Sequence, residues 1–197
     1  MTEKLFCSSD RDFVQVAENY KRIKYNVDNA LARSGRTDNV RIMAVTKTVE
    51  PDKVNFAAGL GIDLLGENRV QELQQKLPLG AYEGKPVHFI GHLQTNKVRQ
   101  VVGHVDLIQS VDSVRLLEAI QKEAQKQNIV QDILLEINIG NEDSKSGFDI
   151  RQIHDVLKNM AAFGNIRVKG FMAIPPICQN SGENLKFFQE MYNLTVD

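Results

Sequence analysis

No charge of one sign dominates this chain: 24 lysines and arginines stand against 25 aspartates and glutamates, which gives a net charge of −1 over 197 residues. A protein that binds DNA or RNA needs a stripe of basic residues for the phosphate backbone. The absence of such a stripe excludes nucleic acid as a partner. Apolar residues make up 42% of the chain, which excludes disorder. The composition therefore predicts an ordinary globular protein with a single domain over residues 1–197.

Long apolar runs and cysteines are also scarce. A membrane-spanning helix needs about 18 consecutive apolar residues, and the runs here, such as 133–135, are far shorter. Residues 1–12 lack the apolar core of a secretory signal. The two cysteines, Cys7 and Cys178, have neither metal-binding nor redox spacing. These absences predict a cytoplasmic protein with free thiols and no contact with a membrane.

The hydrophobic periodicity changes repeatedly after a first helix, which is expected at residues 9–34. Short apolar segments, typical of buried parallel strands, alternate with amphipathic helices. The expected strands are 40–45, 62–65, 87–90, 105–108, 133–139 and 166–174. One expected helix begins at Pro51, and the others lie at 68–77, 98–102, 112–127, 149–160 and 183–194. The alternation fits an open doubly wound sheet or a (β/α)₈ barrel. The first turn from strand to helix lacks G-x-G-x-x-G, which favours the barrel.

Lys47 directly follows the first expected strand. In parallel α/β folds the chemistry gathers at the carboxyl ends of the strands. A lysine at this position is ordinarily a solvated residue at the start of a loop. The alternative is a nucleophilic amine that forms a Schiff base at the mouth of a barrel, where burial and positive charge would lower its pKa.

Other strand ends carry polar or sulfur-containing side chains, and each has a structural alternative. An amide such as Asn68 offers a donor and an acceptor, or caps the next helix. If His92 points into a barrel mouth, His88 faces inward as well, because side chains alternate along a strand with a period of two. Two histidines alone make too incomplete a ligand set for a metal site. Asn138 precedes a polar loop at 141–147, and Met172 could pack against a planar ring or in the core.

Six segments of the sequence together resemble the pyridoxal-phosphate homeostasis protein family, which is related to the N-terminal barrel of alanine racemases. They are AVTKT at 44–48, GENRVQEL at 66–73, HFIGHLQTNK at 88–97, IQSVDS at 108–113, LLEINIGNEDSKSG at 134–147 and VKGFMAIP at 168–175. They occur in the order and at the spacing of the family. They cover nearly the whole chain beyond residue 40.

The resemblance implies a (β/α)₈ barrel of the TIM type that binds pyridoxal 5′-phosphate (PLP). Lys47 aligns with the lysine that holds this cofactor as a Schiff base. We expect Asn68, His92, Asn138 and Met172 to contact it. Members of the family have no established catalytic reaction and are regarded as cytosolic proteins that influence vitamin B6 and amino-acid pools. The resemblance thus predicts no catalytic residue and no metal.

The family continues for some thirty residues that have no counterpart here. That segment supplies the last two strands and the phosphate-gripping residues. Three explanations follow: the sequence is a fragment of a longer product, which we favour, it borrows strands from a second copy, or it forms an incomplete barrel that binds PLP poorly. Weakened binding of PLP by this exact chain is tested by titration against a chain with the segment restored. We expect a monomer, with a swapped or edge-paired dimer as the alternative for a truncated chain.

Two other functions compete with PLP homeostasis. A small racemase-like PLP enzyme would exchange the α-proton of an amino acid with solvent. A regulatory module without PLP would act through a partner protein that does not depend on Lys47. Besides PLP, the homeostasis function predicts amino acids or other amines as ligands, because an incoming amine can exchange with the lysine.

Overall fold

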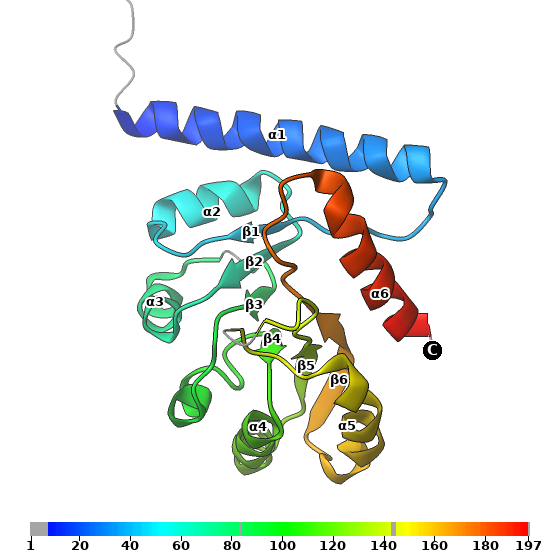
Figure 1. Cartoon of the computed structure of the whole chain (residues 1–197). Coiled ribbons are helices and arrows are strands. Elements are labelled where there is room, and N and C mark those ends of the chain that lie inside the picture. Colours follow the sequence, from blue (N-terminus) through cyan, green and yellow to red (C-terminus); the bar gives the residue numbers. More distant parts are fainter. Residues whose placement is uncertain (1–7, 83, 143–144, 197) are drawn as a thin grey trace, which may run out of the picture. The chain divides into compact units, whose positions relative to one another are not determined.

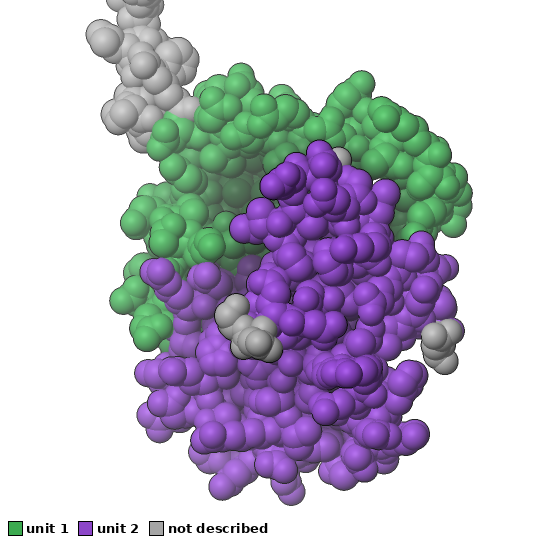
Figure 2. All heavy atoms as spheres, viewed as in Figure 1, with its two compact units in different colours: residues 1–66, 71–87 green, residues 67–70, 88–197 purple. Residues whose placement is uncertain are grey.

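The structure is a computed structural model, and it describes residues 8–82, 84–142 and 145–196. Its strands follow one another in the sheet in chain order, from β1 to β6. The chain divides into two compact units, residues 1–66 with 71–87 and residues 67–70 with 88–197 (Figure 2). Each unit has buried apolar side chains of its own.

The first unit holds the long helix α1, shorter helices and a parallel pair of strands (Figure 1). The elements are α1 (Ser8–Ser34), β1 (Met43–Val45), α2 (Pro51–Gly59), most of β2 (Leu64–Glu67), most of α3 (Val70–Lys76) and the 3₁₀ helix η1 (Leu77–Leu79). In the strand pair, Met43 lies beside Leu64 and Val45 beside Gly66. All four residues of β2 are buried, so this strand lies at the centre of the unit's core. Pro51 begins α2, as predicted, because its fixed φ suits the first turn of a helix.

Side chains join α1 to the remainder of the first unit. The rings of Phe13 and Phe56 lie 4.8 Å apart between centroids, and the hydroxyl of Tyr20 donates to the carbonyl of Gly61 at 2.8 Å. The long first helix therefore packs on α2 and on the loop that follows it.

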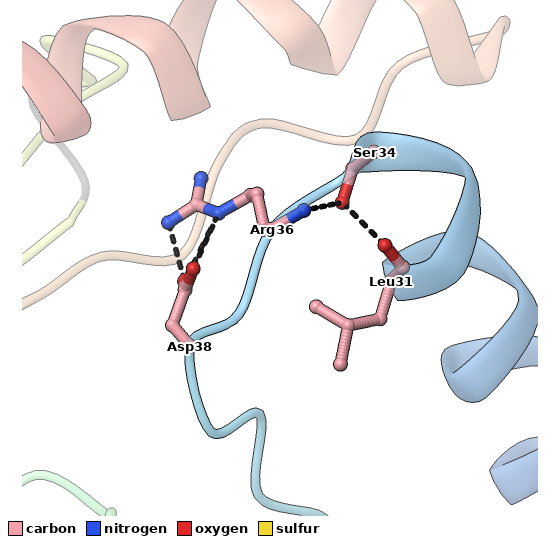
Figure 3. Close-up of polar contacts among 4 residues, drawn as sticks. All are labelled: Leu31, Ser34, Arg36 and Asp38. Carbon is pink, nitrogen blue, oxygen red and sulfur yellow. Dashed lines mark hydrogen bonds and ion pairs between the residues drawn. The ribbon is translucent and has the colours of Figure 1, made fainter.

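The end of α1 is fixed by local polar contacts (Figure 3). Gly35 adopts a φ of +65°, a left-handed conformation in which glycine commonly ends a helix. The hydroxyl of Ser34 donates to the carbonyl of Leu31 at 2.8 Å. The guanidinium of Arg36 donates from Nε to Asp38 at 3.0 Å and holds the pKa of that carboxyl below its usual value. These contacts direct the chain from the helix toward β1.

The second unit contains the remaining strands and three further α-helices. The elements are the main part of β3 (Val87–Phe89), η2 (Thr95–Gln100), β4 (Leu107–Val111), α4 (Val114–Gln127), β5 (Gln131–Glu136), η3 (Ile150–Gln152), α5 (Ile153–Asn159), η4 (Met160–Ala162), β6 (Ile166–Met172), η5 (Ser181–Asn184) and α6 (Leu185–Val196). Strands β3 to β6 pair in parallel, each with the next along the chain. Helix α4 buries a stripe of four residues, Leu116, Leu117, Ile120 and Ala124.

The alternation of strands and helices is confirmed, and four details differ from the prediction. The segment expected to be the third helix of the alternation is the six-residue 3₁₀ helix η2. The third strand ends at Phe89, the fifth at Glu136 and the sixth at Met172, each earlier than the apolar runs suggested. Apolar residues continue past these ends because the following turns are also partly buried. In the described part of the chain, no helix has the length and apolar character needed to cross a membrane.

Candidate functional site

Lys47 lies in a tight turn directly after β1. The turn is closed by the amide of Val49, which donates to the carbonyl of Thr46 at 3.1 Å. Lys47 is the second residue of this turn and Thr48 the third, with a φ of +59°. The Lys47 side chain is exposed, and no hydrogen bond or ion pair involves its amine among the described residues. The amine is therefore held on a structured turn and left available.

Residues of α3 contact the main chain on both sides of Lys47. Glu72 accepts the amide of Thr48 at 2.6 Å, measured to Oε2. Lys76 donates from Nζ to the carbonyl of Thr46 at 2.6 Å. The two side chains also form an ion pair at 3.3 Å, and only 8% of Lys76 and 16% of Glu72 is exposed. An ion pair of a buried lysine and a largely shielded glutamate thus bonds to the main chain of the turn.

Thr46 anchors the beginning of the same turn to β2. It is buried, its amide donates to the carbonyl of Gly66 at 2.9 Å, and its hydroxyl lies 3.2 Å from that same oxygen. This anchor therefore ties the Lys47 turn to a fully buried strand.

In the second unit, Asn68 lies against the end of β3. The amide of Ile90 donates to the carbonyl of Glu67 at 2.8 Å. A Cβ atom added to Gly91 would lie 1.9 Å from the carbonyl oxygen of Asn68, so only glycine fits there. Within the described ranges, the Oδ1 atom of Asn68 is buried without a hydrogen-bond partner. A buried acceptor without a partner is uncommon and indicates a ligand or water.

His92 and two carboxylates meet at the ends of β3, β4 and β5. Nδ1 of His92 lies 3.3 Å from Oδ2 of Asp112. His92 and Glu136 both line a cavity of about 310 Å³, which Asn138 also lines. Burial raises the pKa of the Glu136 carboxyl, the charge of Asp112 raises it further, and His92 opposes both. This cavity therefore presents a histidine and a carboxyl whose pKa is raised.

His88 does not share the surroundings of His92, contrary to what an alternating strand through both residues would give. β3 ends at Phe89, so the period of two does not extend to His92. His88 is buried and its Nδ1 lies 2.7 Å from Nε2 of Gln109, whereas the His92 side chain is 62% exposed. Among the described residues, no group of three or more histidines, cysteines and acids could hold a metal ion.

The amide of Asn138 organises the loop that follows it. Its Nδ2 donates to the carbonyls of Glu142 at 2.9 Å and Lys145 at 3.3 Å, and its Oδ1 accepts the amide of Glu142 at 3.2 Å. The loop was predicted at 141–147, and its residues 143–144 lie outside the described part. Asn138 thus touches the cavity and also shapes its rim.

Met172 is half-buried at the end of β6, and its carbonyl accepts the amide of Ile137 at 2.8 Å. The ends of β5 and β6 are therefore tied together beside Glu136. Cys178, one of the two predicted free thiols, forms no disulfide in the described chain, and Cys7 lies outside the described residues.

Four contributing residues were not predicted: Glu72, Lys76, Asp112 and Glu136. A signal for the first two exists, because a glutamate and a lysine four residues apart pair on one face of a helix. Asp112 and Glu136 lie at or near strand ends, where polar residues are the expected carriers of chemistry.

Comparison with known proteins gives consistent matches along the chain. The family model of the alanine racemase N-terminal domain matches residues 19–195. A pyridoxal phosphate homeostasis protein of Aquifex aeolicus is 35% identical over 182 residues, which is 92% of this chain and 80% of that protein. The protein of the same name from Escherichia coli K12 is 32% identical over 165 residues, or 81% of this chain and 70% of that protein.

Solved structures match as well. An unknown protein from Bifidobacterium adolescentis superposes with a TM-score of 0.87 at 27% identity, covering 98% of this chain and 81% of that one. PipY of Synechococcus elongatus, solved with PLP bound, gives a TM-score of 0.75 at 26% identity, covering 92% and 80%. An alanine racemase from Clostridium difficile gives 0.66 at 13% identity, over 88% of this chain and 46% of the racemase, which is a likeness of fold alone. The predicted fold is thus confirmed as the alanine racemase N-terminal type, a TIM-barrel-like α/β fold of which six parallel strands are present.

Proposed function

This chain belongs to the pyridoxal phosphate homeostasis protein family, and from that membership we propose that it binds PLP through Lys47 and takes part in the homeostasis of vitamin B6 and amino acids. A relative solved with PLP bound supports the cofactor. The observation that carries the role of Lys47 is its amine, which lies on a structured turn at the end of β1 and is engaged by no other described residue.

The residues of this chain fit such a group. PLP supplies an aldehyde that condenses with a primary amine, with loss of one water molecule, to give a Schiff base. The buried Oδ1 of Asn68 lacks a partner and can accept a hydrogen bond from a ligand. We propose His92, Asn138 and Met172 as further contacts. His92 would donate a hydrogen bond, Asn138 would organise the rim of the cavity, and Met172 would pack against a planar ring.

We propose a carrier rather than a catalyst. Reversible capture keeps a reactive aldehyde from other amines, and exchange with an incoming amine, such as an amino acid, releases it. The names of the relatives support this role, since they describe homeostasis and not a reaction. We place the function in the cytoplasm, where the thiol of Cys178 would stay reduced.

The test is a titration of the chain with PLP, followed by its absorption spectrum. We expect the yellow absorbance of a Schiff base in the unmodified chain and its loss in Lys47→Ala. The matched control is Lys21→Ala, which removes another exposed lysine and should leave the absorbance unchanged. Equal absorbance from Lys47→Ala and the unmodified chain would reject Lys47 as the attachment point.

A further inference from the structure

The turn that carries Lys47 has a conformation that its own sequence disfavours. A φ of +59° at the third position of a turn suits glycine or asparagine, but this chain has the β-branched Thr48 there. Such a conformation persists only where the surroundings hold it. The hydrogen bonds at Thr46 and Thr48 identify what holds this one.

We propose that Glu72 and Lys76 are positioning residues for Lys47. Glu72 accepts the amide of Thr48, and Lys76 donates to the carbonyl of Thr46, each at 2.6 Å. One side chain therefore fixes the main chain after Lys47, and the other fixes it before Lys47. With both neighbours held, the direction in which the Lys47 side chain leaves the main chain is set before any aldehyde arrives.

The burial of this pair argues for the same role. Removing two charges from water is costly, and apolar residues of similar volume often serve stability as well as a buried ion pair does. Lys76 is nevertheless buried and Glu72 is largely shielded from water, and each also bonds to the turn that carries Lys47. An apolar pair could fill the space but could not bond to the main chain at Thr46 and Thr48. This inference rests on the proposed function, since it concerns how Lys47 meets PLP.

The experiment measures the rate at which PLP is trapped on Lys47 by cyanoborohydride, at several PLP concentrations, with peptide mapping to locate the product. Glu72→Leu and Lys76→Met each remove one contact and keep the apolar volume. Glu72→Gln keeps an acceptor for the Thr48 amide. Lys126→Met is the matched control, because Lys126 also pairs with a glutamate of its own helix but is 76% exposed.

We expect the maximal trapping rate to fall about tenfold in Glu72→Leu and Lys76→Met, because a small misplacement of a reacting group has a large effect on rate. The concentration of PLP for half-maximal rate should change much less. Glu72→Gln and Lys126→Met should stay near the unmodified chain. Amide exchange at Thr48 should accelerate in Glu72→Leu, which reports the release of the turn directly.

A second substitution separates positioning from a general loss of folding. Thr48→Asn places a residue that tolerates positive φ in the turn, so the double variant Glu72→Leu/Thr48→Asn should recover part of the trapping rate. Unchanged trapping in a folded Glu72→Leu chain with faster Thr48 exchange would overturn the inference, and so would a double variant no faster than Glu72→Leu. If the unmodified chain traps no PLP on Lys47, the proposed function itself fails, and Lys47 has no reaction to be positioned for.

Discussion

At the scale of single residues, the candidate site contains polar side-chain groups that have no hydrogen-bond partner among the described residues. Lys47 is exposed on a turn that other residues hold in place. Asn68 buries an acceptor without a partner among the described residues. The carboxyl of Glu136 lies half-buried near Asp112 and has no hydrogen bond among the described residues. Asn68 and Glu136 depart from the rule that buried polar groups are satisfied, and such departures gather at functional sites.

Glu136 predicts a particular dependence of stability on pH. Its pKa is raised in the folded chain, first by burial and then by Asp112. The folded state therefore binds more protons than the unfolded state at a pH between the ordinary glutamate value of 4.5 and the raised value. The contribution of Glu136 to stability is present below pH 4.5 and is lost as the pH rises through the folded pKa.

The variant Glu136→Gln removes this contribution. We expect the free energy of unfolding of the variant, relative to the unmodified chain, to rise as the pH increases from 4 to 7. Urea unfolding across that range measures the difference. A difference that stays flat with pH, or that falls, would mean that the Glu136 carboxyl is not destabilised by its surroundings.

Gly91 predicts a large loss of stability from one added methyl group. A Cβ atom there would lie 1.9 Å from the carbonyl oxygen of Asn68, and main-chain atoms cannot move aside as a flexible side chain can. We expect Gly91→Ala to lower the free energy of unfolding by about 3 kcal/mol. Gly59→Ala is the control, since nothing lies within 4 Å of its added Cβ. A Gly91→Ala chain as stable as this control would contradict the contact between Gly91 and Asn68.

At the scale of elements, helix α4 shows how the ends of a helix are specified. Ser113 precedes the helix in an extended conformation, and its hydroxyl accepts the amide of Leu116 at 3.4 Å. Asn128 ends the helix with a φ of +55°, which asparagine tolerates better than most residues. Between the two ends, the stripe of buried residues packs the helix against the rest of the second unit.

The cap of α4 predicts a modest and specific effect. Ser113→Ala should lower the free energy of unfolding by about 1 kcal/mol, because the Leu116 amide at the helix start loses the hydroxyl and keeps only the Ser113 carbonyl as its acceptor. Ser113→Thr keeps the hydroxyl and should lose much less. Thermal unfolding of the three chains measures both effects, and equal losses in the two variants would show that the hydroxyl is not the stabilising group.

Elements were predictable from the sequence where packing follows a simple period, and less so where it does not. The helix at 112–127 was predicted from its apolar stripe, and α4 confirms it at 114–127. The 3₁₀ helix η2 was predicted as an ordinary helix, because six residues with one buried valine give too little periodicity. The expectation that His88 and His92 share one surface failed because β3 ends three residues before His92.

The candidate site was predictable in part for a related reason. A lysine at a strand end was a local signal, and a family motif surrounds Lys47. The contacts that Glu72 and Lys76 make with the Lys47 turn were not predictable, because these side chains bond to main-chain atoms 24 and 30 residues away. Main-chain contacts leave no pattern of residue types in the sequence. The structure was needed to find them.

At the scale of the whole molecule, a single family match covers nearly the whole chain. The match to the family model extends from residue 19 to residue 195, so the family accounts for both units. Distant racemases share the fold at 12–13% identity, which is too low to bring a reaction with it. The proposed role is therefore that of a protein that holds PLP and does not turn over an amino acid.

That role predicts no exchange of the α-proton of alanine with solvent. Incubation of the PLP-loaded chain with L-alanine in D₂O should incorporate no more deuterium at Cα than PLP alone does, by mass spectrometry. Lys47→Ala serves as the control for a reaction that depends on the attached cofactor. Incorporation well above that of free PLP, lost in Lys47→Ala, would establish a racemase-like activity instead.

The central claim is that Lys47 carries PLP, and one measurement tests it most directly. The chain is mixed with PLP, reduced with borohydride, digested and mapped by mass spectrometry. We predict that the pyridoxyl mass is found mainly on the peptide that contains Lys47, and that the other 13 lysines of the sequence carry only traces. A label spread over many lysines, or concentrated on another one, would contradict the account.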